Sequence, residues 1–270
     1  MEGGYHVVVC GSVVPDPLQT LEPTAGPAGP ALKNEMMLPA ILDPWASHAL
    51  YEAAHLAMGR PGTRVWLVCL GPKAKLRQVM MTVAQKVPFE LVALDGPASG
   101  FTDATEVALL LAEAIQAIPA LDPSRLLVFG GWESASRGSG ATLQILGEAL
   151  GITEQFQGVD ALVVGADGGL EVLERIEGGR HQVSTCSGPP ALFGWATGGL
   201  AEPKNDPQVG MANMRLVLPS LQKARATKLT GEGLRFETVE LPKQLRDTRV
   251  VKDRSADDVA REIVAWIKGG

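Results

Sequence analysis

Residues 125–150 begin with Arg125-Leu126-Leu127-Val128-Phe129-Gly130, continue through a run of small residues, and end in the helical pattern of Ser139–Leu150. The opening run is apolar throughout rather than alternating, which is typical of a strand inside a parallel sheet with both faces covered. Glycine at position 151 ends the helical pattern. The stretch therefore predicts a buried strand, a turn and a helix, the repeating unit of an α/β fold.

Three further runs of the same apolar kind precede this stretch: His6–Cys10, Arg64–Leu70 and Glu90–Leu94. Helical patterns lie between the runs and are expected over Pro44–Met58, Pro72–Lys86 and Thr102–Ile118, the last with Thr102 as its N-cap. Strands and helices that alternate with short links predict right-handed βαβ units. The expected fold class is therefore α/β, a doubly wound and mostly parallel sheet of Rossmann-like or adenine-nucleotide-hydrolase-like type.

The remaining segments are expected to add to this sheet. Residues 17–42 contain several prolines and glycines without clear periodicity, which indicates a long excursion or a weak hairpin. From Val159 on, short apolar runs separated by glycine pairs at 168–169 and 178–179 indicate antiparallel hairpins. Residues 199–256 are expected to be irregular. Ser255 is expected to cap a final helix, whose apolar stripe is formed by Val259, Ile263, Trp266 and Ile267.

These patterns divide the chain into an α/β nucleotide-binding-type domain over residues 1–198 and a second part over residues 199–270. The second part is expected to hold a docking loop and an extended C-terminal arm that ends in the final helix. A lone amphipathic helix after about 50 irregular residues is explained by docking on a partner chain. A simple return of this helix to the same core is the alternative.

The composition limits the classes of function. Hydrophobic residues make up 46% of the 270 and charged residues 20%, as in an ordinary globular protein with a core. The net charge of -6 disfavours nucleic acid as the main partner, because that binding needs a basic surface. No apolar run approaches the roughly 20 residues that span a bilayer, so the chain is not expected to cross a membrane.

Cysteine usage and the first residues bear on the compartment. Cys10 and Cys69 lie inside apolar runs, and neither they nor Cys186 form a CxxC pair, which favours a reducing compartment. The first residues do not have the pattern of a signal peptide, because Glu2 and the following glycines lead straight into a strand. A cytoplasmic protein is therefore expected, with an organelle matrix as the alternative if a presequence has been removed.

The candidate ligand site is the turn between the strand and the helix of the opening stretch. Small residues expose backbone N–H groups there, and the helix dipole adds positive potential, so the turn is suited to a phosphate. Side chains and backbone of six residues are expected to contribute: Arg137, Gly138, Ser139, Gly140, Ala141 and Thr142. The turn that follows the first strand, with Gly11 and Ser12, flanks the same crevice by its position. A flexible loop before a capped helix is the alternative, and the turn lacks both the P-loop lysine and the GxGxxG motif.

A second segment, Leu218–Lys228, has the composition of a docking loop. A Leu-Pro corner with an apolar residue is followed by basic residues, which suits an acidic partner. No Ser-His-Asp, Cys-His or paired-carboxylate arrangement stands out. Asp16, Asp43 and Glu133 lie near the expected mouth of the crevice, but nothing marks one of them as a base. The sequence thus indicates a binding site without an autonomous catalytic constellation.

Taken together, these segments resemble the β subunit of electron transfer flavoprotein. Residues 131–151 align without a gap with that family's Gly-Lys-Gln-Ala-Ile-Asp-Asp-Asp-Ser-Asn-Gln-Thr-Gly-Gln-Met-Leu segment, and the matching residues are Ser139, Thr142, Gln144 and Leu146. Other segments with family counterparts, in order, are Val14-Pro15-Asp16, Asp43-Pro44-Trp45 with Ala49–Ala53, Val68–Pro72, Glu177-Gly178-Gly179 and Leu218–Ala224. The resemblance covers roughly residues 5–230, and the final helix fits the family's subunit-clasping tail.

The resemblance implies a heterodimer with an α subunit that carries the redox-active FAD. The β subunit closes one side of the flavin site and usually buries an AMP of structural role. Electrons pass from a flavin-dependent dehydrogenase to FAD and onward to a membrane quinone oxidoreductase. The cofactor-binding residues would be Gly11, Ser12, Asp43, Leu70, Gly131 and residues 137–142. The recognition loop would dock on the dehydrogenase through Leu218, Pro219, Leu221 and Lys223.

The chain departs from the family at the AMP site. The family's Asp-Asp-Asp is replaced by Ser136-Arg137-Gly138, and its Asn-Gln by Gly140-Ala141. These are the positions that hold the AMP phosphate and adenosine in typical members. The Asp-Gly-Asp-Thr-Ala-Gln signature of bifurcating members is also absent, which disfavours flavin-based bifurcation. Two alternatives stay open, a regulatory α/β domain that binds AMP or ATP without a redox role, and a small-molecule enzyme with a loop-borne site.

Overall fold

The continuous apolar runs form the centre of a parallel sheet. A computed structural model describes residues 4–26, 29–97, 101–229, 237–238, 240 and 250–269. The chain divides into two units, Met1–Val239 and Glu240–Gly270. In the larger unit, strand β1 (His6–Pro15) pairs in parallel with β5 (Arg64–Gly71) and with β7 (Leu126–Gly131), and β6 (Glu90–Asp95) pairs with β5. The four strands predicted from the sequence are thus confirmed.

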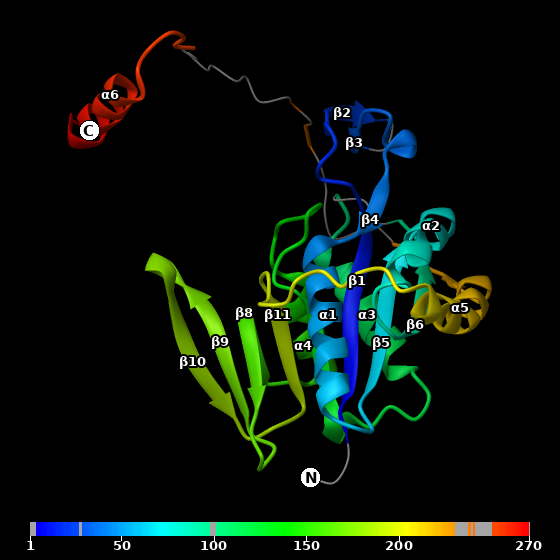
Figure 1. Ribbon diagram of the computed structural model, residues 1–270. Helices are drawn as coiled ribbons and strands as arrows, with labels where there is room; N and C mark the ends of the chain where they lie inside the picture. The colour runs from blue at the N-terminus through cyan, green and yellow to red at the C-terminus, as the bar shows by residue number, and fades with distance from the viewer. Residues whose placement is uncertain are drawn as a thin grey trace. The chain divides into compact units, whose positions relative to one another are not determined.

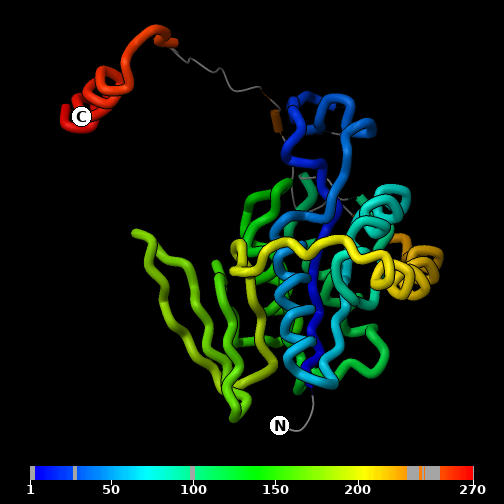
Figure 2. The backbone as a smooth tube through the Cα atoms, viewed as in Figure 1, coloured from blue at the N-terminus to red at the C-terminus, as the bar shows by residue number. Residues whose placement is uncertain are grey.

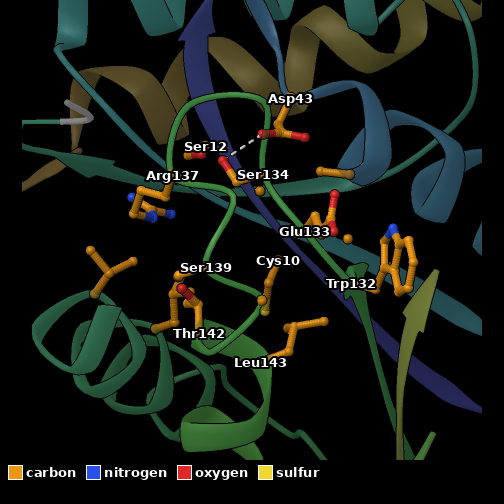
Figure 3. A pocket seen from close by; sticks show the side chains of 16 residues that line it. Cys10, Ser12, Asp43, Trp132, Glu133, Ser134, Arg137, Ser139, Thr142 and Leu143 are labelled. Carbon is orange, nitrogen blue, oxygen red and sulfur yellow. Dashed lines mark hydrogen bonds between the residues drawn. The ribbon is translucent and has the colours of Figure 1, made fainter. Parts of the chain in front are cut away.

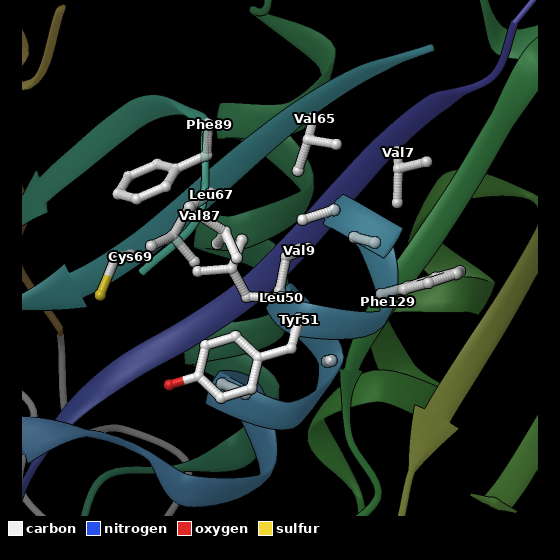
Figure 4. Close-up of a cluster of buried hydrophobic side chains, with 14 of the residues drawn as sticks. Val7, Val9, Leu50, Tyr51, Val65, Leu67, Cys69, Val87, Phe89 and Phe129 are labelled. Carbon is white, nitrogen blue, oxygen red and sulfur yellow. The ribbon is translucent and has the colours of Figure 1, made fainter. Parts of the chain in front are cut away.

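Helices cover both faces of this sheet (Figure 1). The first face packs against α1 (Pro44–Gly59), α2 (Lys73–Val83) and α5 (Pro207–Gln222), and the second against α3 (Ala104–Gln116) and α4 (Thr142–Leu150). Successive residues of a strand point to opposite faces. Val7 and Val9 therefore belong to the first core, part of which Figure 4 shows, whereas Val8 belongs to the second. The predicted doubly wound α/β fold is confirmed.

The order of the strands reverses at β1. Along the sheet the strands follow the order β10-β9-β8-β11-β7-β1-β5-β6-β12. The chain passes from β1 to β5 and β6 on one side and then crosses to β7 on the other. The space beyond the carboxyl ends of β1 and β7 is therefore the topological switch point, where ligands of such sheets bind.

Two short strands of this sheet were not predicted from the sequence. Strand β11 (Ala191–Trp195) lies in parallel between β7 and β8 (Glu154–Val164), and β12 (Arg225–Ala226) pairs with the edge of β6. A run as short as Ala-Leu-Phe-Gly-Trp has no distinguishing periodicity. Burial on both faces, between two longer strands, is what makes β11 a strand.

The predicted antiparallel hairpins are confirmed. Strands β8, β9 (Leu170–Ile176) and β10 (Arg180–Cys186) pair antiparallel in succession and extend the sheet past the helices (Figure 1). The excursion after β1 contains a second small hairpin, β2 (Pro23–Gly26) with β3 (Gly29–Leu32). Strand β4 (Ala40–Leu42) then returns antiparallel along the end of β1. This return brings residue 43 beside the carboxyl end of β1.

The expectation that residues 199–256 are irregular is wrong for residues 207–222, which form α5. The Asp206 side chain accepts hydrogen bonds from the backbone N–H groups of Gln208 (2.8 Å) and Val209 (3.3 Å), and Pro207 occupies the first turn. Pro219 suggested a break, but it lies in the last turn, where it removes only one N–H donor. Helix α5 lies beside α2 (Figure 2). Residues 230–236, 239 and 241–249 lie outside the described residues.

Helix ends also differ from the expected ones. The N-cap of α3 is Asp103 rather than Thr102, because the Asp103 carboxylate accepts a hydrogen bond from the Thr105 N–H at 2.7 Å. Helix α4 begins at Thr142 rather than Ser139, and α2 ends at Val83. Among the described residues, no helix combines the length and the apolar character that crossing a bilayer requires.

The second unit contains helix α6 (Ala256–Gly269). Its predicted cap is confirmed, because the Ser255 hydroxyl accepts a hydrogen bond from the Asp258 N–H (3.2 Å) and donates one to the Asp258 carboxylate (2.7 Å). None of the residues of α6 is buried. The expected apolar stripe is present, and the second unit does not itself bury it.

Asn213 fastens α5 to α2, and its removal is expected to destabilise the larger unit. The buried side-chain amide donates to the carbonyl oxygens of Ala84 (2.8 Å) and Val87 (2.7 Å). Asn213→Ala leaves these two acceptors without their donor, so we expect the free energy of unfolding to fall by about 1–3 kcal/mol. Urea denaturation measures this loss.

The matched control is Met211→Ala on the exposed side of the same helix. It is expected to change the free energy of unfolding by less than about 0.5 kcal/mol. Equal urea midpoints for Asn213→Ala and the unaltered protein would contradict the role assigned to Asn213.

Candidate functional site

A pocket lies at the switch point, beyond the carboxyl ends of β1 and β7 (Figure 3). Residues at the ends of both strands line it, together with the first turns of α1 and α4 and one side of α3. The segment between β7 and α4 forms much of its wall. Its volume is about 50 Å³. The strand-helix turn that the sequence singled out is thus part of a pocket.

Most of the expected cofactor-binding residues meet in this pocket, and three do not. Those that line it are Gly11, Ser12, Asp43, Gly131, Arg137, Ser139, Gly140 and Thr142. Leu70 is fully buried in the core beneath α3. Gly138 and Ala141 belong to the same turn but do not line the pocket. Sequence reasoning missed Ser134, a hydroxyl in a turn of small residues, and Trp132, the first residue after β7.

The carboxylate of Asp43 is the most connected group of the pocket. Its Oδ1 accepts a hydrogen bond from the Trp45 N–H at 3.1 Å, which caps the N-terminus of α1. Its Oδ2 accepts hydrogen bonds from the Ser134 hydroxyl at 2.8 Å and from the Ala135 N–H at 2.9 Å. The Asp43 N–H donates to the Ser12 carbonyl oxygen at 2.9 Å. One side chain therefore joins the end of β1, the start of α1 and the segment after β7.

Burial sets the electrostatics of this pocket. Burial raises the pKa of Asp43, while the hydrogen bonds from Ser134, Ala135 and Trp45 and the charge of Arg137 act against the rise. Burial also lowers the pKa of Arg137, and the nearby Asp43 charge acts against that change. A guanidinium remains protonated at neutral pH in any case. The pocket thus contains the carboxylate of Asp43 and the guanidinium of Arg137, and each charge favours the ionised form of the other group.

Arg137 is partly anchored inside the pocket. Its guanidinium donates a hydrogen bond to the Thr102 hydroxyl at 3.1 Å. Its Nε is buried and has no hydrogen-bond partner among the described residues. In Figure 3, Arg137 and Trp132 lie on opposite sides of the pocket, with Ser134 between them. The Nε–H group of Arg137 is therefore a donor without an acceptor among the described residues.

Two glycines make the turn possible. A side chain at Gly131 would place its Cβ 2.5 Å from the Cβ of Trp45 and 2.6 Å from the Glu133 carbonyl oxygen, so β7 could not end this close to α1. Gly140 has a φ of 66°, in the left-handed region that residues with a side chain rarely adopt. The small residues of the turn thus serve the backbone path as well as any ligand.

The N-terminus of α4 opens towards the pocket without a side-chain cap. Ala141 precedes the helix and offers no hydrogen-bond acceptor from its side chain, which contradicts the alternative of a capped helix. The hydroxyls of Ser139 and Thr142 lie nearby, at the edge of the pocket. Helix N–H groups, hydroxyls and a guanidinium are the donors that bind an oxyanion.

The donors suit a phosphate, but the pocket does not admit a nucleotide. A volume of about 50 Å³ holds a few water molecules, whereas pockets for small organic ligands measure about 300–1,000 Å³. AMP therefore does not fit among these residues, and FAD, which is larger, does not fit either.

The described residues that line the pocket include no histidine and no ionised thiol. Burial raises the pKa of the Cys10 thiol to about 12, so the thiol is protonated at neutral pH. The Ser134 hydroxyl donates to Asp43, but no histidine lines the pocket. Within the described residues, no group of three or more His, Cys, Asp or Glu side chains is placed to hold a metal ion. The hydroxyls and the guanidinium that line the pocket are groups that can bind an oxyanion.

The expected recognition residues lie at the end of α5 and not in a loop. Leu218 is exposed over 38% of its surface, whereas Leu221 is buried in the first core. The Lys223 N–H donates to the Pro219 carbonyl oxygen at 3.0 Å and closes the helix. Leu218 is thus available to a partner, and Leu221 is not.

The raised pKa of Asp43 predicts a pH dependence of stability. In the folded protein the carboxyl group holds its proton to a higher pH than the ordinary value of 3.8. Between the two pKa values the folded state binds more protons than the unfolded chain, so stability falls as the pH rises. Asp43→Asn lacks this titration. We expect the stability of the unaltered protein relative to Asp43→Asn to fall as the pH rises from about 4 and then to level off.

Urea denaturation of both proteins at a series of pH values measures this difference. Two stability curves that run parallel over the whole series would contradict the raised pKa of Asp43.

No protein-family model matches the chain, and no curated protein matches it. A function for this chain is therefore argued from its residues and their geometry.

Proposed function

We propose that this chain is the β subunit of a heterodimeric electron transfer flavoprotein. In this role it passes electrons from a flavin-dependent dehydrogenase, through FAD held mainly by an α subunit, towards a membrane quinone oxidoreductase. The proposal is supported by the order and spacing of the segments between Val14 and Ala224 that resemble the family. The doubly wound sheet agrees with the fold that this resemblance implies.

The observation that carries the proposal is the apolar stripe of helix α6. Within its own unit the helix buries none of its residues, Trp266 and Ile267 included. A helix of 14 residues is marginal on its own in water and is stabilised by burying an apolar face. Such a stripe supports a subunit that docks on another chain, and a self-contained regulatory domain has no use for it.

The exposed surface of α5 supports a second docking site. Leu218, Leu216 and Met211 are all exposed on this helix; Arg215 lies among them in the sequence, and Lys223 follows the end of the helix. Apolar side chains next to basic ones suit a partner with acidic residues around an apolar pocket. We assign this surface to the dehydrogenase.

The size of the pocket supports a flavin held by the other subunit. FAD supplies the electron-transfer chemistry when it is bound. This chain would close one side of the flavin site.

We place the heterodimer in the cytoplasm. Cys10 and Cys69 are free and buried, and Cys186 is also free. Thiols of this kind persist in a reducing compartment. Within the described part of the chain no helix is suited to span a membrane, so we propose that the quinone oxidoreductase downstream provides the link to the membrane.

Co-expression with the product of a neighbouring gene tests the heterodimer. We expect the chain to be colourless when purified alone and the complex to be yellow, with the absorption spectrum of a flavin. Trp266→Ala should weaken the complex at least tenfold, because buried tryptophans dominate interfaces of this kind. Gel filtration and the flavin absorbance of the purified complex measure both effects.

Lys268→Ala, an exposed residue in the last turn of α6, is the matched control and should leave the complex intact. A stable, colourless monomer that binds or hydrolyses ATP or AMP would refute the carrier and favour the regulatory domain.

Leu218→Ala tests the docking surface on α5. Removing this exposed side chain should lower the rate of electron acceptance from the dehydrogenase by about tenfold, because it removes apolar contact area from a small interface. The FAD content should not change, since Leu218 does not line the pocket. Stopped-flow reduction of the complex measures the rate, with Gln208→Ala at the other end of the same helix as control. Loss of FAD with an unaltered rate would refute the role of Leu218.

A further inference from the structure

We infer that the pocket at the ends of β1 and β7 is closed by the chain's own segment Trp132–Gly140, fastened to Asp43, and that it carries no nucleotide. This segment is called the strap below. The inference concerns the pocket alone and does not depend on the electron-carrier function. It follows from the hydrogen bonds that hold the strap, from the space that its side chains fill and from the charged side chains that line the pocket.

The strap is tied down at its centre by a buried carboxylate. The Ser134 hydroxyl and the Ala135 N–H both donate to Asp43, at 2.8 and 2.9 Å. Only 3% of Asp43 is exposed, so these hydrogen bonds are shielded from water. Within the strap, the Gly138 N–H donates to the Ser134 carbonyl oxygen at 3.0 Å. The strap therefore has a defined conformation and does not lie loosely over the pocket.

The two flanks of the strap are also held. At its start, the Trp132 N–H donates to the Trp195 carbonyl oxygen at 3.0 Å and so continues the pairing of β7 with β11. The Trp132 ring packs against Gly158, where an added Cβ would lie 3.3 Å from the ring. Farther along, the Arg137 guanidinium reaches Thr102 at 3.1 Å. The strap is thus fixed on both sides of the pocket as well as at its centre.

The side chains of the strap take up the space of a ligand. With Trp132, Ser134 and Arg137 in place, the pocket retains about 50 Å³. This space accepts a few water molecules and excludes a base with its ribose. A nucleotide could enter only after the strap had left Asp43.

The closed pocket already contains negative charge. The carboxylates of Asp43 and Glu133 line it together with Arg137, whose charge acts favourably on Asp43. A phosphate brought into this space would meet these carboxylates and would compete with Asp43 for Arg137. Like charges in a poorly solvated site repel strongly. The side chains that line the pocket therefore disfavour a bound phosphate.

Nucleotide content tests the closed pocket directly. The full chain, and its complex if one is obtained, is denatured, and the released nucleotides are identified by mass spectrometry. AMP is then titrated into the native protein by calorimetry. We expect less than about one tenth of a mole of AMP per mole of chain and no binding at AMP concentrations up to about 1 mM. One mole of AMP per mole of chain would overturn the inference.

Limited proteolysis tests the fastening of the strap. Trypsin cleaves after Arg137 only when the strap opens, because a protease needs an extended, accessible segment. Ser134→Ala removes one of the two hydrogen bonds to Asp43 and should raise the rate of cleavage after Arg137 about tenfold, the effect of one ordinary hydrogen bond on a local opening. Mass spectrometry of the fragments gives the rate.

Ser139→Ala, in the same segment but not bonded to Asp43 in the described structure, is the matched control and should cleave at the rate of the unaltered protein. Equal cleavage rates for Ser134→Ala and the unaltered protein would show that Asp43 does not fasten the strap.

The outcomes separate this inference from the proposed function. A yellow complex that contains stoichiometric AMP would overturn the closed pocket and leave the electron carrier standing. A colourless, nucleotide-free chain that forms no complex would overturn the electron carrier and leave the closed pocket standing.

Discussion

Strand β1 is confined between two parallel neighbours, and the remaining elements of the larger unit are arranged around this constraint. Its residues pair with β5 along one edge and with β7 along the other, and alternate side chains enter the two cores. Most of the buried side chains of β1 are apolar, with His6 and Ser12 as its buried polar residues, and the candidate pocket lies near the carboxyl end of the strand. The helices that follow β1 and β7 begin at that same end, which places their N-termini around one small space.

Asp43 connects the parts that meet there. Burying a carboxylate costs several kcal/mol unless donors and a positive charge surround it. Trp45, Ser134 and Ala135 supply the donors, and Arg137 supplies the charge. The start of α1 and the strap therefore stabilise each other through one group. This coupling explains why a turn rich in small residues is well defined and why the space beneath it is small.

The elements that were predicted correctly are those marked by a local sequence pattern. The continuous apolar runs predicted the central strands, and the glycine pairs predicted the hairpins. Helix α5 was missed because its prolines suggested a break, although Pro207 begins the helix and Pro219 lies in its last turn. Its stability comes from Asn213 and from apolar contacts with distant residues, which no local pattern reveals.

By itself, the sequence determined the fold class, the place of the candidate site at a strand-helix turn and the amphipathic character of the final helix. These properties follow from the spacing of apolar residues and from the backbone conformations that glycine and proline prefer. Both signals are local and extend over only a few residues. The tertiary structure alone decided that the turn is tied to Asp43 and that its pocket is nearly filled. Ser134 and Asp43 are 91 residues apart, and only the parallel placement of β1 beside β7 brings the two side chains within hydrogen-bonding distance.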